Sequence, residues 1–220
     1  MIRTQYASIV KHYLPYLPES RDAKILDFGS GRGVITDFLL GQGYTGVAAF
    51  ERDERERARL SKGAAAVTTF GADHSKFLRE RACRWDAVIL KDVLYYFDDP
   101  SALVFLNELR EFMQPGGVLI VEIFNGACLT APYVLYKDRG IRRVFTEHSL
   151  ASVLEEAGFS REVVCGIRPA VRGPVSLAFF LLSRAWQLVL RGIYLAERGI
   201  DSQNPSTLEK RIVLVAKAPL

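Results

Sequence analysis

Cysteine, histidine and methionine are scarce in this chain of 220 residues, which has three cysteines, three histidines and two methionines. Cys83, Cys128 and Cys165 are widely spaced and form no CxxC pair. This spacing disfavours a disulfide framework or a zinc site, and buried reduced thiols are expected instead. No group of histidine and acidic residues has the spacing of metal ligands, so no metal is expected.

Long apolar runs are also missing from the first 20 residues, so no signal peptide is evident and we expect a cytoplasmic protein. Internal repeats and low-complexity tracts are absent as well. Hydrophobic residues make up 49% of the chain and charged residues 25%. These values exclude intrinsic disorder and a fibrous protein, and the length suits one α/β domain.

The positive charge is unevenly placed. Residues 1–160 carry 20 basic and 21 acidic side chains, whereas residues 161–220 carry 9 basic and 4 acidic side chains. The whole basic excess therefore lies in the last quarter, together with the longest apolar segment of the chain, at 175–196.

Strand-like and helix-like segments alternate from residue 24 to residue 124, which predicts a doubly wound parallel sheet. Expected strands are 24–28, 46–50, 66–70, 85–90 and 118–124, followed by 163–167 and 211–216. Expected helices are 2–14, 34–40, 52–62 and 101–113, with a later helix that Thr146 caps and that runs to Glu156. We expect a single domain over 1–220, with an N-terminal helix or lid (1–20), a core (21–168), an apolar helical insertion (169–205) and a last strand (206–220).

A glycine-rich turn, DFGSGRG at 27–33, joins the first strand to the next helix. Its glycines let the backbone turn sharply and approach a ligand, and the helix offers free N–H groups. Val34 stands where the nicotinamide fingerprint needs glycine or alanine, which disfavours that cofactor. Asp27 suits a ligand with an ammonium group and ribose. Glu51, at the end of the second strand, is placed to accept hydrogen bonds from ribose hydroxyls.

The chain resembles the class I S-adenosylmethionine-dependent methyltransferases over about residues 20–168 and the final strand. Segments that match this family's motifs, in order, are LDFGSGRG at 26–33, GAD at 71–73, WDAVILKDVLYYF at 85–97, PGGVLIVEIFN at 115–125 and FTEHSLASVLEEAGF at 145–159. The resemblance implies a Rossmann-like fold with a mostly parallel seven-stranded sheet, helices on both faces and a helical insertion before an antiparallel last strand.

S-adenosylmethionine is the cofactor that this resemblance implies. The residues assigned to it are Asp27, Gly29, Ser30, Gly31, Gly33, Glu51, Arg52, Asp73, His74 and Lys91. Asp73 would contact adenine, although it is also a candidate helix N-cap. For His74 the alternative is a polar loop residue.

Methyl transfer from a sulfonium needs proximity, alignment and exclusion of water, and a hydroxyl acceptor also benefits from a base. Residues just past the fourth strand face the reacting methyl in such folds, which points to Asp92, Tyr95 and Tyr96 as catalytic residues. Asp92 is placed to take a proton or hold a hydroxyl, and the tyrosines to stack on an acceptor ring. The alternative is that Asp92 caps a turn and one tyrosine packs.

The later half is similar to bacterial methyltransferases found with O-antigen and other surface-glycan assembly. Asp138 and Phe145-Thr146 fall at that group's spacing, but Ile141 occupies its histidine position. The resemblance implies O-methylation of a sugar hydroxyl on a glycan or lipid-linked glycan. Alternatives are a soluble small molecule or lipid quinone as acceptor, or a non-catalytic, cofactor-binding assembly partner.

The apolar segment 174–198 has its arginines on one stripe about 100° wide. Arg184 and Arg191 interrupt it, so a full membrane span is not expected. Three placements remain open: a membrane-interface helix with arginines at lipid headgroups, a homodimer interface, or a core helix. Nucleic acid is disfavoured as a partner because the charge is interleaved with aliphatic residues.

Overall fold

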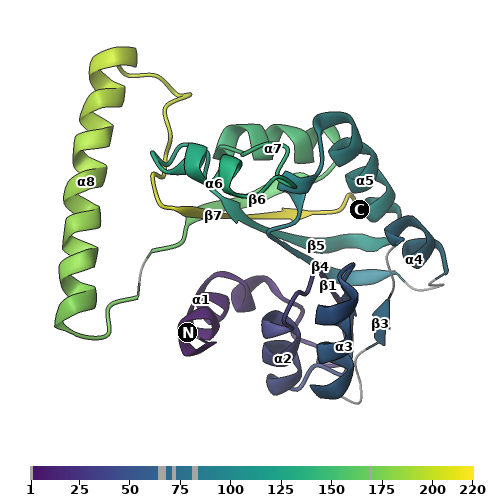
Figure 1. Cartoon of the computed structure of the whole chain (residues 1–220). Helices are drawn as coiled ribbons and strands as arrows, with labels where there is room; N and C mark the ends of the chain where they lie inside the picture. The colour runs from purple at the N-terminus through teal and green to yellow at the C-terminus, as the bar shows by residue number, and fades with distance from the viewer. Residues whose placement is uncertain (1, 64–67, 71–72, 81–83, 169) are drawn as a thin grey trace.

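A computed structural model describes the whole chain except residues 1, 64–67, 71–72, 81–83 and 169 (Figure 1). Its centre is a seven-stranded sheet with the order β3-β2-β1-β4-β5-β7-β6. The strands are β1 (Lys24–Phe28), β2 (Gly46–Phe50), β3 (Thr68–Phe70), β4 (Trp85–Lys91), β5 (Met113–Phe124), β6 (Ser160–Gly166) and β7 (Arg211–Lys217).

The first five strands pair in parallel, and β7 runs antiparallel to both of its neighbours, β5 and β6. The chain steps outward from β1 to β3 and then returns to β4 on the other side of β1. In parallel sheets a ligand binds at such a reversal, outside the carboxyl ends of the strands. The predicted doubly wound fold is therefore confirmed, including the antiparallel last strand.

Helices cover both faces of the sheet (Figure 1). On one face, α1 and α2 pack on the sheet through a cluster that includes Ile9, Tyr13 and Phe38; on the other, α4, α5 and α7 pack through a cluster around Phe77, Phe105 and Leu150. The helices are α1 (Ile2–His12), α2 (Val34–Gly41), α3 (Glu54–Gly63), α4 (His74–Glu80), α5 (Asp99–Glu111), α6 (Ala131–Lys137), α7 (Glu147–Glu156) and α8 (Pro174–Arg198), with short 3-10 turns η1 (Leu14–Tyr16) and η2 (Leu94–Tyr96).

Local sequence explains most of these boundaries. Thr146 caps α7, because its hydroxyl accepts a hydrogen bond from the Ser149 backbone N–H at 3.2 Å, as expected. The helix expected to reach residue 113 ends at Glu111 instead, and β5 already begins at Met113, which pairs with Trp85 of β4. Residues 66–67 of the expected third strand lie outside the described residues.

The helix α8 stands apart from the sheet, joined to it by extended segments at both ends (Figure 1). Within α8, all of whose residues are described, only Gln187 and Leu190 are buried. Ten large apolar side chains are exposed: Val175, Leu177, Phe179, Leu181, Leu182, Trp186, Leu188, Val189, Ile193 and Leu195. The alternative of an ordinary core helix is therefore excluded.

The polar stripe of α8 faces the protein itself. Arg184 lies 3.8 Å from the carboxylate of Glu209, and Arg191 donates a hydrogen bond to the Ser206 carbonyl at 3.2 Å. The arginines predicted to meet lipid headgroups are thus engaged by the chain, and the apolar face points outward. Over the described residues, no helix combines the length and the apolar character that crossing a bilayer requires.

Candidate active site

The glycine-rich turn after β1 is held against the end of β2. The backbone N–H groups of Gly29 and Ser30 donate to the Phe50 carbonyl at 2.8 and 3.1 Å. Gly29 and Gly31 have φ angles of 76° and 53°, a region that favours glycine. A Cβ at Gly29 would lie 2.6 Å from Val93, whereas one at Gly31 would meet nothing within 4 Å. The turn therefore packs tightly on one side and leaves open space at Gly31.

Glu51 connects this turn to the end of β2. Its carboxylate accepts a hydrogen bond from the Gly31 N–H at 2.7 Å and another from the Asp53 N–H at 2.8 Å. The structure thus brings Glu51 to the open side of the turn, as the 20-residue spacing predicted. Arg52, the next residue, is exposed.

Asp27 lies beneath the turn and is 1% exposed. Its Oδ2 accepts hydrogen bonds from the backbone N–H and the hydroxyl of Thr36 in α2, at 3.1 and 2.6 Å. Its Oδ1 is buried with no hydrogen-bond partner among the described residues. Burial raises the pKa of Asp27 to about 6, and the bonds from Thr36 lower it only in part. A cation brought close to this carboxylate would recover part of the cost of burying its charge.

Asp73 and His74 open α4 at the neighbouring strand end. Asp73 is exposed and accepts a hydrogen bond from the Lys76 N–H at 3.1 Å, which is the geometry of a helix N-cap. His74 is half-buried among aromatic rings, with its centroid 5.4 Å from Phe105 and 6.4 Å from Phe28. Asp73 therefore acts as a helix N-cap and His74 packs against aromatic rings, and both residues make these contacts with the chain itself.

A charged network lies at the carboxyl end of β4. The guanidinium of Arg211 contacts Asp92 Oδ1 and Glu122 Oε1, each at 2.5 Å. Lys91 also pairs with Glu122 and lies 3.7 Å from Asp92 Oδ2. The Tyr13 hydroxyl donates to Glu122 Oε2 at 2.5 Å. Two cations and two carboxylates thus balance each other beside the glycine-rich turn.

Glu122, Arg211 and Tyr13 are members of this network that sequence reasoning missed. A signal was present, because Glu122 is an acid inside an otherwise apolar strand and is only 4% exposed. Burial raises the pKa of Glu122, but Arg211 and Lys91 outweigh this effect and hold it below its usual value. Glu122 is therefore ionised and fixes both cations around Asp92.

The backbone places Asp92 in an unusual conformation. Its φ angle is 60°. Among the described residues, all others with positive φ are glycines. Its N–H donates to the Glu122 carbonyl at 2.9 Å. Left-handed backbone at a residue with a Cβ costs about 1–2 kcal/mol, and such residues gather at functional sites. Half-exposed and held by Arg211, the Asp92 carboxylate stays accessible at the strand end.

Tyr95 and Tyr96 follow Asp92 in η2 and differ in exposure. Tyr95 is 9% exposed, and burial together with the charge of Asp92 raises the pKa of its hydroxyl. Tyr96 is 45% exposed, and its hydroxyl donates to Asp138 at 3.2 Å. Ile141, at the position where a histidine would be expected from the resemblance to glycan methyltransferases, is buried in the core. One tyrosine therefore packs and the other remains open to a ligand.

The turn, its open space and the carboxylates around it suit a nucleoside cofactor that carries a cationic amino-acid tail. Glycines allow close backbone approach, Glu51 presents oxygens to hydroxyl groups, and the unpartnered Asp27 Oδ1 favours positive charge nearby. Among the described residues, no three histidine, cysteine or acidic side chains are placed to hold a metal ion. Fold and site together define a class I S-adenosylmethionine-dependent methyltransferase.

Sequence comparison gives the family. The model for the methyltransferase domain matches residues 2–163, and the chain belongs to this family. The protein is an enzyme that uses S-adenosylmethionine as methyl donor. No curated relative matches the chain.

Solved structures share the fold at low sequence identity. An S-adenosylmethionine-dependent methyltransferase from Archaeoglobus fulgidus aligns with a TM-score of 0.69 at 16% identity, covering 99% of this chain and 94% of that one. A chain of the complex between the Haloferax volcanii Trm112 methyltransferase activator and the putative methyltransferase aligns with a TM-score of 0.70 at 13% sequence identity. The alignment covers 100% of this chain and 92% of that one. A putative methyltransferase from Bacillus halodurans aligns with a TM-score of 0.63 at 17% sequence identity, covering 98% of this chain and 99% of that one.

Proposed function

We propose that this methyltransferase O-methylates a sugar hydroxyl of a glycan or lipid-linked glycan. The observation that carries the proposal is the Asp92 carboxylate, fixed by Arg211 at the end of β4 beside the exposed ring of Tyr96. A sugar offers a hydroxyl to the carboxylate and an apolar ring face to the aromatic side chain. The spacing of Asp138 and Phe145-Thr146, typical of surface-glycan methyltransferases, supports the same acceptor class.

S-adenosylmethionine supplies an activated methyl group, so the protein must mainly align the acceptor and exclude water. The turn at 27–33 binds the cofactor, Glu51 holds its ribose hydroxyls, and Asp27 keeps the turn anchored to α2. Lys91 and Asp92 line the reacting end. Asp92 orients the acceptor hydroxyl and takes its proton, while Arg211 holds the carboxylate in position.

Replacing Asp92 by alanine tests this assignment. Turnover should fall by about 10²–10⁴-fold, the usual contribution of a base, while cofactor affinity is retained. Transfer of a labelled methyl group to activated sugars and lipid-linked glycans measures turnover, and calorimetry with S-adenosylhomocysteine measures cofactor affinity. Full activity of the variant would remove Asp92 from the mechanism. Transfer only to small molecules or quinones would replace the acceptor class, and cofactor binding without transfer to any acceptor would favour a non-catalytic assembly role.

We further propose that the outer apolar face of α8 rests on an anionic membrane surface, where lipid-linked glycans are found. Soluble monomers rarely expose contiguous apolar patches larger than a few hundred Å², and this face is uncharged along most of its length. The basic excess of residues 161–220 attracts an anionic surface at long range, although Arg184 and Arg191 themselves contact the protein rather than the outer face. Flotation with anionic liposomes is expected. A homodimer that buries this face and ignores liposomes would contradict the proposal.

A further inference from the structure

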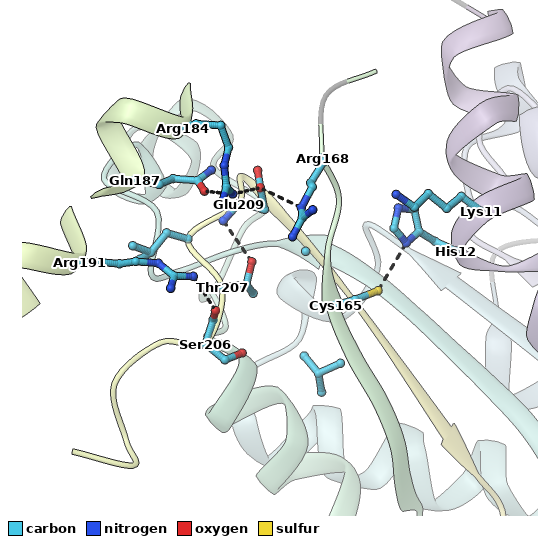
Figure 2. A pocket seen from close by; sticks show the side chains of 13 residues that line it. Lys11, His12, Cys165, Arg168, Arg184, Gln187, Arg191, Ser206, Thr207 and Glu209 are labelled. Atoms are coloured by element: carbon cyan, nitrogen blue, oxygen red, sulfur yellow. Dashed lines mark hydrogen bonds and ion pairs between the residues drawn. The ribbon is translucent and has the colours of Figure 1, made fainter. Parts of the chain in front are cut away.

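A cavity of about 320 Å³ lies between α8, the end of β6, the segment 206–209 and the C-terminal end of α1 (Figure 2). It is separate from the glycine-rich turn, and two arginines of the stripe on α8, Arg184 and Arg191, line it. Its charged and hydroxyl-bearing lining residues include Lys11, Arg168, Arg184, Arg191, Thr207 and Glu209. A cavity of this size is at the small end for ligand sites, so it suits a small charged group better than a whole acceptor.

Positive charge dominates this cavity. Of the side chains that line it, Lys11 and three arginines carry positive charge, and Glu209 carries negative charge. His12 also lines it, but burial and the neighbouring Lys11 lower the pKa of its ring, so it is neutral near pH 7. The charges therefore leave an excess of three positive groups around a recess that is partly shielded from water.

Glu209 orients two of the guanidinium groups without fully occupying them. It is 6% exposed, and Figure 2 shows Arg168 and Arg184 approaching it from two sides. Both ion pairs measure 3.8 Å, well beyond the 2.7–2.9 Å of a charge-assisted hydrogen bond. Arg184 is also held by Gln187 at 3.0 Å. Both guanidinium groups thus lie near Glu209 and retain donors for a further acceptor, and Arg184 is held more firmly than Arg168, whose side chain is 62% exposed.

Two connections link the wall of this cavity to the charged network of the active site. Ile167, next to the cavity wall at Gly166, donates its N–H to the Arg211 carbonyl at 2.9 Å, and the side chain of Arg211 holds Asp92. On the α1 side, Lys11 and His12 are followed by Tyr13, whose hydroxyl bonds Glu122. The cavity wall and the network around Asp92 are therefore linked both through the pairing of β6 with β7 and through the C-terminal end of α1.

We propose that this cavity is an anion subsite that binds the phosphate or diphosphate group of the acceptor, with the sugar directed toward Asp92. Arginine forks match phosphate oxygens in pairs, and three arginines with Lys11 suit a diphosphate better than a carboxylate. This assignment rests on the proposed sugar O-methylation. A nucleoside diphosphate sugar and a polyprenyl diphosphate sugar share the required chemistry.

Calorimetry with inorganic pyrophosphate tests the subsite without relying on activity. The wild-type protein should bind pyrophosphate, and Arg184→Gln and Arg191→Gln should each weaken binding about tenfold or more, as expected for a lost hydrogen bond to a charged group. Lys11→Gln should weaken it as well, and it lies outside α8, so a shift of that helix cannot explain the loss. Arg198→Gln is the matched control, because Arg198 lies on the same helix but pairs with Asp201 and Asn204.

Acceptor kinetics then separate the two proposals. Diphosphate sugars, nucleotide-linked or polyprenyl-linked, should have a lower KM than the same free sugars, and Arg184→Gln with Arg191→Gln should remove that difference while leaving free-sugar turnover intact. The better of the two diphosphates identifies the source. No pyrophosphate binding, binding unaffected by the variants, or equal KM values would overturn the subsite even if sugars are methylated. Methylation of no sugar at all would instead overturn the proposed function.

Discussion

Gly31 is the residue at which cofactor binding and folding can be separated. Its φ angle is 53°, and a Cβ there would point into open space beside the turn. Gly31→Ala should therefore cost only about 1–2 kcal/mol of stability from the left-handed backbone, while the new methyl group occupies space that the cofactor needs. Affinity for S-adenosylhomocysteine should fall at least tenfold in calorimetry.

Gly43→Ala provides the matched control for this change. Gly43 also has positive φ, 87°, and open space around its Cβ position, but it lies after α2, away from the turn. Its variant should lose similar stability in thermal unfolding and no cofactor affinity. Equal affinity losses in both variants would mean that the cofactor does not approach Gly31.

Asp27 should make stability depend on pH in an unusual direction. Its pKa is raised from 3.8 to about 6 by burial, so the folded protein holds a proton that the unfolded chain has already released. Stability from this group is full below about pH 4 and is lost as pH rises through 6, by about 3 kcal/mol for a two-unit shift. Asp27→Asn does not ionise, so it should gain stability relative to wild type across this window. Urea unfolding of both proteins from pH 4 to 7 measures the difference, and a constant difference would mean an ordinary pKa for Asp27.

Residues near one another in sequence were the predictable part of the site. The turn, Glu51 and the residues after β4 follow directly from local spacing, and the structure gathers them at one sheet edge. Arg211 and Glu122 were missed because 89 positions separate them, and only the antiparallel pairing of β5 with β7 brings them together. That pairing register is not readable from local patterns.

At the scale of elements, α8 shows where pattern reading reaches its limit. The periodicity correctly predicted one helix with a polar stripe and a broad apolar face. It could not predict which side faces the protein, because the usual rule turns the apolar side inward. Here Glu209, Ser206 and Asp201 bind the arginines, so contacts remote from the helix pattern set its orientation.

The outward face of α8 predicts a specific loss of liposome binding. Leu181 and Leu188 are 57% and 69% exposed, so replacing both by glutamine leaves the packing of the protein unchanged. Removing two apolar side chains should weaken membrane partition by about 2 kcal/mol, more than tenfold. Flotation with anionic liposomes measures it. Val104→Gln on α5, 66% exposed, is the control that should float like wild type.

At the scale of the whole molecule, cofactor binding should stabilise the fold. A ligand that binds only the folded state at 100 times its Kd adds about 2.7 kcal/mol, which raises Tm by about 5–10 °C for a chain of this size. Thermal unfolding with S-adenosylhomocysteine should show this shift, and NAD at the same concentration should show none. A shift with NAD alone would contradict the cofactor assignment.

The order of strands and helices was predictable because each parallel strand is a short apolar run followed by an amphipathic helix. Helix α6 was missed and α4 was anticipated only through Asp73 as a candidate N-cap, since seven residues each give too little periodicity to recognise. That residues 1–220 form a single domain stays a prediction.

The segment that carries α8 leaves and re-enters the sheet at adjoining points, since Ile167 bonds the backbone of Arg211 and Gly166 pairs with Ile212. Residues 170–204 can therefore be exchanged for a short linker, or for the corresponding segment of another methyltransferase, while β6 and β7 keep their register. The segment that selects the acceptor could then change between related enzymes while the cofactor-binding sheet and its helices stay the same.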